Sequence, residues 1–71
     1  MRKGEIASAR SQFEEAVRLK PDYAAAHYNL GVVFVALKEP DPARIEFQKA
    51  LSADPNYRPA RDALARFNQT P

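Results

Sequence analysis

The sequence repeats itself with a period of 34 residues, and this period limits the possible folds more than any other feature. Shifting the chain by one period superimposes small, aromatic or turn-forming residues on residues of the same type. The pairs are Ala9/Ala43, Phe13/Phe47, Ala16/Ala50, Pro21/Pro55, Tyr23/Tyr57, Ala26/Ala60 and Leu30/Leu64. A fixed period of this size is typical of stacked helical hairpins, because one hairpin alone cannot bury its apolar face.

Apolar residues recur at helical spacing and predict four helices. Positions 6, 9, 13, 16 and 17 share one face of a first helix, about residues 5–19. Positions 23, 27, 30, 34 and 37 form the main stripe of a second helix, about 22–38, which a further stripe at 28, 32 and 35 makes apolar nearly all round. A third helix ends before Pro55, and a fourth starts at 56 or 57 with Pro59 in its first turn. The fold class is therefore all-α, with antiparallel hairpins and no candidate strand.

Prolines mark the ends of the predicted helices. The first helix closes before Pro21, because a residue that precedes proline avoids the helical region, and Asp22 is expected to cap the second helix. Pro40 is expected to stop the second helix, with Asp41 as the N-cap of the third and Pro42 at its first helical position.

Composition excludes several classes of function. A chain of 71 residues makes one domain, residues 1–71, and the absence of cysteine excludes disulfides and thiolate metal sites. A formal charge of +2 is too small to predict a nucleic-acid surface, so no nucleic acid partner is expected. The longest apolar run, residues 32–37, is far shorter than the roughly 20 residues that cross a bilayer. With no signal segment in view either, we expect a soluble protein without membrane insertion, cytoplasmic by default.

These residues resemble the tetratricopeptide repeat family, whose repeat also has 34 residues. The positions that match its Leu-Gly, Tyr, Ala, Phe and Pro pattern in order are Leu30-Gly31, Phe34, Ala43, Phe47 and Pro55, while His27 replaces the usual tryptophan. Gly31 and Ala43 are small where two helices of a hairpin would cross, and Phe34 and Phe47 are large where space must be filled.

The resemblance implies an α-solenoid of four helices. Residues 1–23 would supply the second helix of a partial repeat, 24–57 a complete repeat, and 58–71 a terminal capping helix with a frayed tail from residue 68. Lys38 and two prolines occupy the turn where the family usually has glycine, as Gly4 does in the partial repeat, so the geometry of that turn stays open.

In this family the first helices of the hairpins line a groove that binds peptide segments. The resemblance therefore implies a protein–protein interaction scaffold with a protein or peptide partner. The groove-facing candidates by helical spacing are Ala25, Tyr28, Asn29, Val32, Val35, Ala36 and Asp62, with Arg58 or Arg66 at the edge. The stripe at 28, 32 and 35 has two interpretations: a floor for a partner, or packing against the fourth helix or a neighbouring repeat. Asn29 stands where chaperone-binding members hold a peptide carboxylate, but the basic residues that support such a site are missing here.

The remaining polar residues predict no chemistry. His27 lies on the main apolar stripe and is interpreted as a packed residue between helices, and Ser8, Ser11 and Ser52 stand without a catalytic signature, so no enzyme and no cofactor are expected. Arg58, Arg61 and Arg66 are interpreted as a solubilising surface, with an acidic partner as the alternative.

An uncovered apolar flank is expected on the first helix, since the first helix of its own repeat is absent. Either a longer protein covers this flank, or the isolated chain self-associates as a homo-oligomer. The alternative function is accordingly a structural self-association element.

Overall fold

The computed structural model describes residues 3–69 and consists there of four α-helices without a strand. They are α1 (Lys3–Leu19), α2 (Ala24–Ala36), α3 (Pro40–Ala53) and α4 (Arg58–Gln69). The all-α prediction is confirmed. Of the tail expected to fray, 68–69 have helical backbone, and 70–71 lie outside the described residues.

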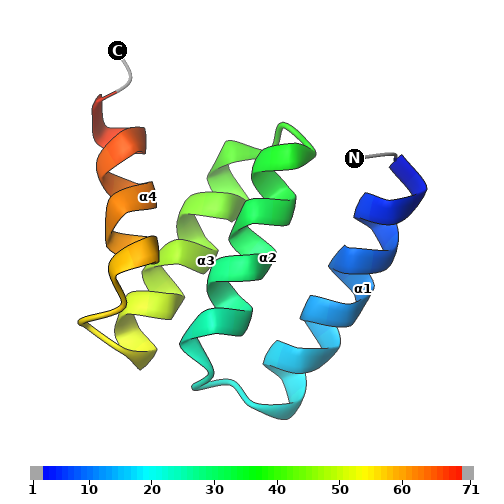
Figure 1. Ribbon diagram of the computed structural model, residues 1–71, viewed down its shortest axis with the longest axis horizontal. Coiled ribbons are helices and arrows are strands. Elements are labelled where there is room, and N and C mark those ends of the chain that lie inside the picture. Colours follow the sequence, from blue (N-terminus) through cyan, green and yellow to red (C-terminus); the bar gives the residue numbers. More distant parts are fainter. Residues whose placement is uncertain (1–2, 70–71) are drawn as a thin grey trace.

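The four helices run side by side in chain order, each antiparallel to the one before it (Figure 1). Helix α2 packs against both α1 and α3, and α4 packs against α3. The array is flat, with principal extents of 30 × 30 × 16 Å. Short turns force this order, because consecutive helices joined by a few residues must be neighbours.

The core lies along α2 and α3. Its buried members are Ala24, Leu30, Phe34, Ala43, Phe47, Ala50 and Ala60. Helix α2 has no charged residue and buries seven of its 13 residues, which agrees with the prediction that a helix apolar nearly all round is covered on more than one side.

Gly31 of α2 packs closely against the Phe47 ring of α3. A Cβ atom at Gly31 would lie 2.5, 2.7 and 3.0 Å from three atoms of that ring. The ring is only 2% exposed, so it has little room to move. Position 31 therefore requires glycine, because the Phe47 ring leaves no room for a Cβ atom.

Both predicted aspartate caps are wrong. The N-cap of α2 is Tyr23 and that of α3 is Glu39, and neither makes a side-chain capping bond. Asp22 lies one residue too early, and the carbonyl of Tyr23 accepts from the amides at 26 and 27. Helix α3 begins at Pro40 instead of Pro42, because proline has no amide to satisfy and its fixed φ suits the first helical position.

Lys38 forms the turn between α2 and α3, where its backbone adopts the left-handed conformation with φ 62°. The amide of Lys38 donates to the carbonyl of Val35 at 3.0 Å, and that of Glu39 donates to the carbonyl of Phe34 at 2.9 Å. These two bonds form the Schellman motif that usually ends in glycine. Lysine thus adopts the backbone that the family's glycine would adopt.

The two turns between hairpins have the same backbone hydrogen bonds. In the first, Lys20 donates to the carbonyl of Ala16 at 2.9 Å, and Tyr23 donates to that of Lys20 at 3.0 Å. One period later, Asp54 donates to the carbonyl of residue 50 at 2.9 Å, and residue 57 donates to that of Asp54 at 3.0 Å. The sequence period is therefore reproduced in the backbone.

Candidate partner-binding groove

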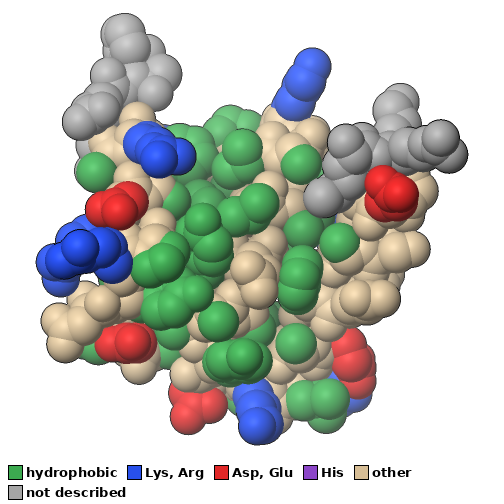
Figure 2. All heavy atoms as spheres, in the orientation of Figure 1, with side chains coloured by type: hydrophobic (Ala, Val, Ile, Leu, Met, Phe, Trp, Pro, Cys, Tyr) green, Lys and Arg blue, Asp and Glu red, His purple; other side chains and the backbone are tan. Residues whose placement is uncertain are grey.

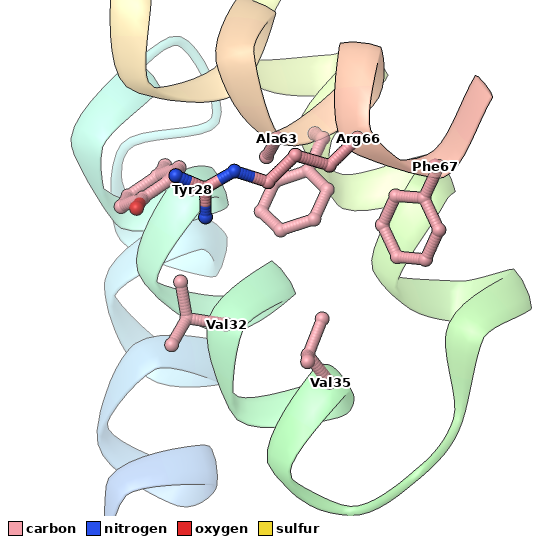
Figure 3. A pocket seen from close by; sticks show the side chains of 7 residues that line it. Tyr28, Val32, Val35, Ala63, Arg66 and Phe67 are labelled. Carbon is pink, nitrogen blue, oxygen red and sulfur yellow. The ribbon is translucent and has the colours of Figure 1, made fainter. Parts of the chain in front are cut away.

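A hollow of about 400 Å³ lies between α2 and α4, with α3 as its floor. Its lining consists of Tyr28, Val32 and Val35 from α2, Phe47 from α3, and Ala63, Arg66 and Phe67 from α4 (Figure 3). Apolar side chains gather on this face over α2 and beside α4 (Figure 2). We call this hollow the α2–α4 groove.

Helical spacing places the three α2 residues in one row. Positions 28, 32 and 35 are separated by four and three residues and therefore share a face. Val32 is 44% exposed and Val35 is 49% exposed, whereas most of α2 is buried. Two exposed valines on a helix without a charged residue form an apolar wall open to solvent.

Aromatic rings form a continuous row along the groove. The ring centroids of Tyr57 and Tyr28 are 5.8 Å apart, those of Tyr28 and Phe47 are 5.6 Å apart, and those of Phe47 and Phe67 are 5.9 Å apart. Such separations are those of favourable aromatic pairs. The guanidinium of Arg44 lies 5.6 Å from the centre of the Phe67 ring. Three rings of this row, those of Tyr28, Phe47 and Phe67, line the groove.

Tyr57 lies at one end of this row and is partly buried. Burial of its hydroxyl raises the pKa of Tyr57 above its ordinary value, with smaller contributions from Tyr28, Tyr23 and Asp54. The desolvated phenol therefore favours its neutral form.

A second hollow of about 350 Å³ lies beside the turn between α2 and α3. It is lined by Val35, Lys38, Glu39, Pro40 and Phe67. Because Val35 and Phe67 line both hollows, the two hollows are neighbours.

The structure brings together Tyr28, Val32 and Val35 of the predicted set, with Arg66, the residue expected at the edge. Ala25, Asn29, Ala36 and Asp62 do not line the hollow.

Sequence reasoning missed three lining residues, namely Phe47, Ala63 and Phe67. The spacing of 63, 66 and 67 shows that they share a face of α4, but only the packing of α4 on α3 turns that face toward α2. Phe47 was identified only as a space-filling residue.

His27 lies outside the groove and is 6% exposed, in agreement with its interpretation as a packed residue. Its Nε2 lies 2.6 Å from the carbonyl oxygen of Pro21, and its Nδ1 lies 2.9 Å from Oε1 of Glu46. Since the carbonyl can only accept, Nε2 donates to it, and Nδ1 is bonded to the carboxylate of Glu46. The residue is thus fixed by two polar partners as well as by packing.

Residues 3–69 contain no group of three or more His, Asp or Glu side chains placed to hold a metal ion. Within the same range, every helix is too short or too polar to span a membrane.

Comparisons with known proteins agree with this architecture. The profile of a family described as "Tetratricopeptide repeat" matches residues 1–58. The chain is 40% identical over 67 residues to the tetratricopeptide repeat domain-containing protein PYG7, chloroplastic, of Arabidopsis thaliana, covering 90% of this chain and 22% of that protein. It is 39% identical over 57 residues to the probable UDP-N-acetylglucosamine–peptide N-acetylglucosaminyltransferase SPINDLY of Petunia hybrida, covering 80% of this chain and 6% of that protein. No solved structure matches the chain significantly.

Proposed function

Because this chain belongs to the tetratricopeptide repeat family, a non-catalytic module whose repeats generally mediate protein–protein interaction, we propose that it binds a segment of another protein in the α2–α4 groove. Within this proposal residues 24–57 form one complete repeat, whose first helix, α2, provides one wall of the groove. The relatives are much longer proteins, since the chain spans only 22% and 6% of their lengths, so their names do not define this partner.

The observation that carries the proposal is the exposed apolar lining of the groove. Val32 and Val35 are half-exposed opposite Phe67, and the buried ring of Phe47 lies at the base. Removing contiguous apolar surface from water is favourable by about 25 cal/mol per Å². An apolar groove that polar residues border is typical of a protein-binding surface.

The test is to select peptides from a random library that bind the chain and to locate them by NMR titration. Selected peptides should shift the resonances of Val32, Val35 and Phe67 most. Val35→Asp should weaken their binding by at least tenfold, because a carboxylate would then be buried in the apolar contact. Ile45→Asp is the matched control, since Ile45 is 51% exposed on α3 and does not line the groove. Peptides that shift only residues outside the groove, or that bind both variants equally, would refute the proposal.

The second candidate is self-association through the same apolar surface, with a second copy in place of the partner. Sedimentation velocity at increasing concentration decides between the two. A dimer or larger species that Val32→Asp with Val35→Asp dissociates, while peptide binding is unchanged, favours self-association. A monomer at high micromolar concentration excludes it.

A further inference from the structure

The buried ring of His27 joins three parts of the fold. It belongs to α2, its Nε2 lies 2.6 Å from the carbonyl oxygen of Pro21 in the turn after α1, and its Nδ1 lies 2.9 Å from Oε1 of Glu46 in α3. His27 is 6% exposed and Glu46 is 8% exposed, so little water competes for these bonds. The ring therefore connects the turn between α1 and α2 to α3.

The two bonds together require a proton on each ring nitrogen. The carbonyl of Pro21 only accepts, and so does an ionised carboxylate of Glu46, whose other oxygen accepts from Lys49 at 3.4 Å. A neutral imidazole has one N–H and serves only one of the two acceptors. At the other contact two lone pairs would then face each other in a buried place, which is unfavourable. The imidazolium form serves both acceptors.

The other charged groups that face the ring lie nearer to solvent. Glu14 and Arg18 of α1 and Lys49 of α3 line a hollow beside His27. Their side chains are 48%, 67% and 56% exposed, and each takes part in an ion pair. Helix α2 itself has no Lys, Arg, Asp or Glu. Because water and salt screen exposed charges, the buried carboxylate of Glu46 has the strongest effect on the proton of the ring.

We propose that His27 is an imidazolium in the folded chain at neutral pH and forms a pH-sensitive link between the α1–α2 turn and α3. An exposed histidine loses its second ring proton at about pH 6.5, so above this pH the unfolded chain binds one proton fewer than the folded chain. The link therefore contributes fully to stability below about pH 6.5, and its contribution declines as the pH rises and the folded ring loses the same proton. A neutral ring then releases one of its two acceptors.

The junction between α3 and α4 provides an internal control. There the guanidinium of Arg61 donates through Nη2 to the carbonyl of Pro55 at 3.1 Å. A guanidinium is not deprotonated in proteins, so this junction keeps its donor at every pH of the experiment. The proposal thus predicts a pH-dependent change at one of two equivalent turns and not at the other.

The first experiment observes the ring directly. His27 is the one histidine of the chain, so its signals need no further assignment. NMR of the ring nitrogens at pH 7 should find both protonated. As the ring titrates, the amide of Asp22, which shares a peptide group with the carbonyl of Pro21, should shift with it. The amide of Asn56, beside the carbonyl of Pro55, should not. A ring with one unprotonated nitrogen at pH 7, or equal shifts at the two amides, would overturn the proposal.

The second experiment measures the linked proton by denaturant unfolding between pH 6 and pH 9. The unfolding constant of the wild type should rise by up to about tenfold for each pH unit above 6.5, which is the value for one proton. Glu46→Gln should flatten this rise, because its amide can donate to a neutral Nδ1. Glu14→Gln is the matched control, since it removes an exposed carboxylate of the hollow beside the ring and should leave the rise unchanged. Parallel profiles for the wild type and Glu46→Gln, with helical circular dichroism in both, exclude the link.

Discussion

Helices α2 and α4 hold the same place in the 34-residue period, yet they meet different surroundings. At the start of each helix a side chain donates to the carbonyl of the preceding proline. His27 of α2 does so through Nε2 at 2.6 Å to Pro21, and Arg61 of α4 does so through Nη2 at 3.1 Å to Pro55. His27 is buried and Glu46 fixes its second nitrogen, whereas Arg61 is exposed. Both junctions between hairpins therefore have a side-chain donor to the proline carbonyl. The buried junction has a histidine in this role, and the exposed junction has an arginine.

The next turn of each helix shows the same contrast. Gly31 faces the buried ring of Phe47, whereas its counterpart Ala65 is exposed. Val32 forms a wall of the groove on α2, and its counterpart Arg66 reaches over the groove from α4. Helix α2 packs against two helices and α4 against one. Positions 31 and 32 of α2 therefore meet other surroundings than the equivalent positions 65 and 66 of α4.

Substitution of Gly31 should have the largest effect on the free energy of unfolding. Gly31→Ala should lower the free energy of unfolding by about 3 kcal/mol, because the new methyl group overlaps the Phe47 ring. In α4 the reverse change, Ala65→Gly, should cost about 1 kcal/mol from helix propensity alone. Chemical denaturation measures both. The double variant with Phe47→Leu should show strong coupling to Gly31→Ala, and additive effects would contradict the overlap.

The free energy of unfolding should depend on the bond between the buried ring of His27 and the carboxylate of Glu46. Glu46→Ala leaves Nδ1 of His27 buried without a bond and should cost about 2 kcal/mol. Glu46→Gln should cost less than about 1 kcal/mol, because a neutral ring can still donate to Pro21 and accept from the new amide. Gln12, one period earlier, is exposed, and Gln12→Ala should change stability by less than about 0.5 kcal/mol. Equal losses for Glu46→Gln and Glu46→Ala in thermal and denaturant unfolding would contradict this arrangement.

A gain in stability is expected where α2 ends. Lys38→Gly should raise the free energy of unfolding by about 1 kcal/mol, because glycine adopts the left-handed conformation without the penalty of a Cβ atom. Lys38→Ala is the control and should bring no such gain. If glycine destabilises the chain in denaturant unfolding, the Schellman turn does not form in solution.

The smallest effect concerns pH at the end of the aromatic row. The pKa of Tyr57 is raised above its ordinary value of 10.0 by burial, so the unfolded chain loses this proton before the folded chain does. The contribution of Tyr57 to stability is therefore complete below pH 10 and declines as the pH rises through the folded pKa. Unfolding curves should show a steeper decline for the wild type than for Tyr57→Phe, and parallel declines would contradict the burial.

Much of the architecture could be predicted from the sequence. The 34-residue period, the helical stripes and the prolines predicted four helices in antiparallel order, and the resemblance to tetratricopeptide repeats is confirmed. The predicted starts of α2 and α3 were wrong. At the start of α2 the carbonyl of Tyr23 accepts the first backbone hydrogen bonds, and α3 begins at Pro40, so neither predicted aspartate acts as a cap. Local rules give several acceptable starts within a few residues, and packing selects one.

The groove was predicted only in part, for a related reason. Helical spacing identified Tyr28, Val32 and Val35, because residues three and four positions apart on one helix lie on the same face. It could not show that Phe47 and Phe67 complete the lining, because those contacts join different helices and depend on how the helices pack.

The sequence by itself determined the period, the helices and the residues that build the stack, because short-range propensity and apolar spacing are local properties of the chain. The tertiary structure alone decided that Lys38 adopts the left-handed conformation, that His27 bonds to Glu46, and that α4 faces α2 across the groove that Arg66 lines. Those features depend on distances between helices, which packing of the whole array sets.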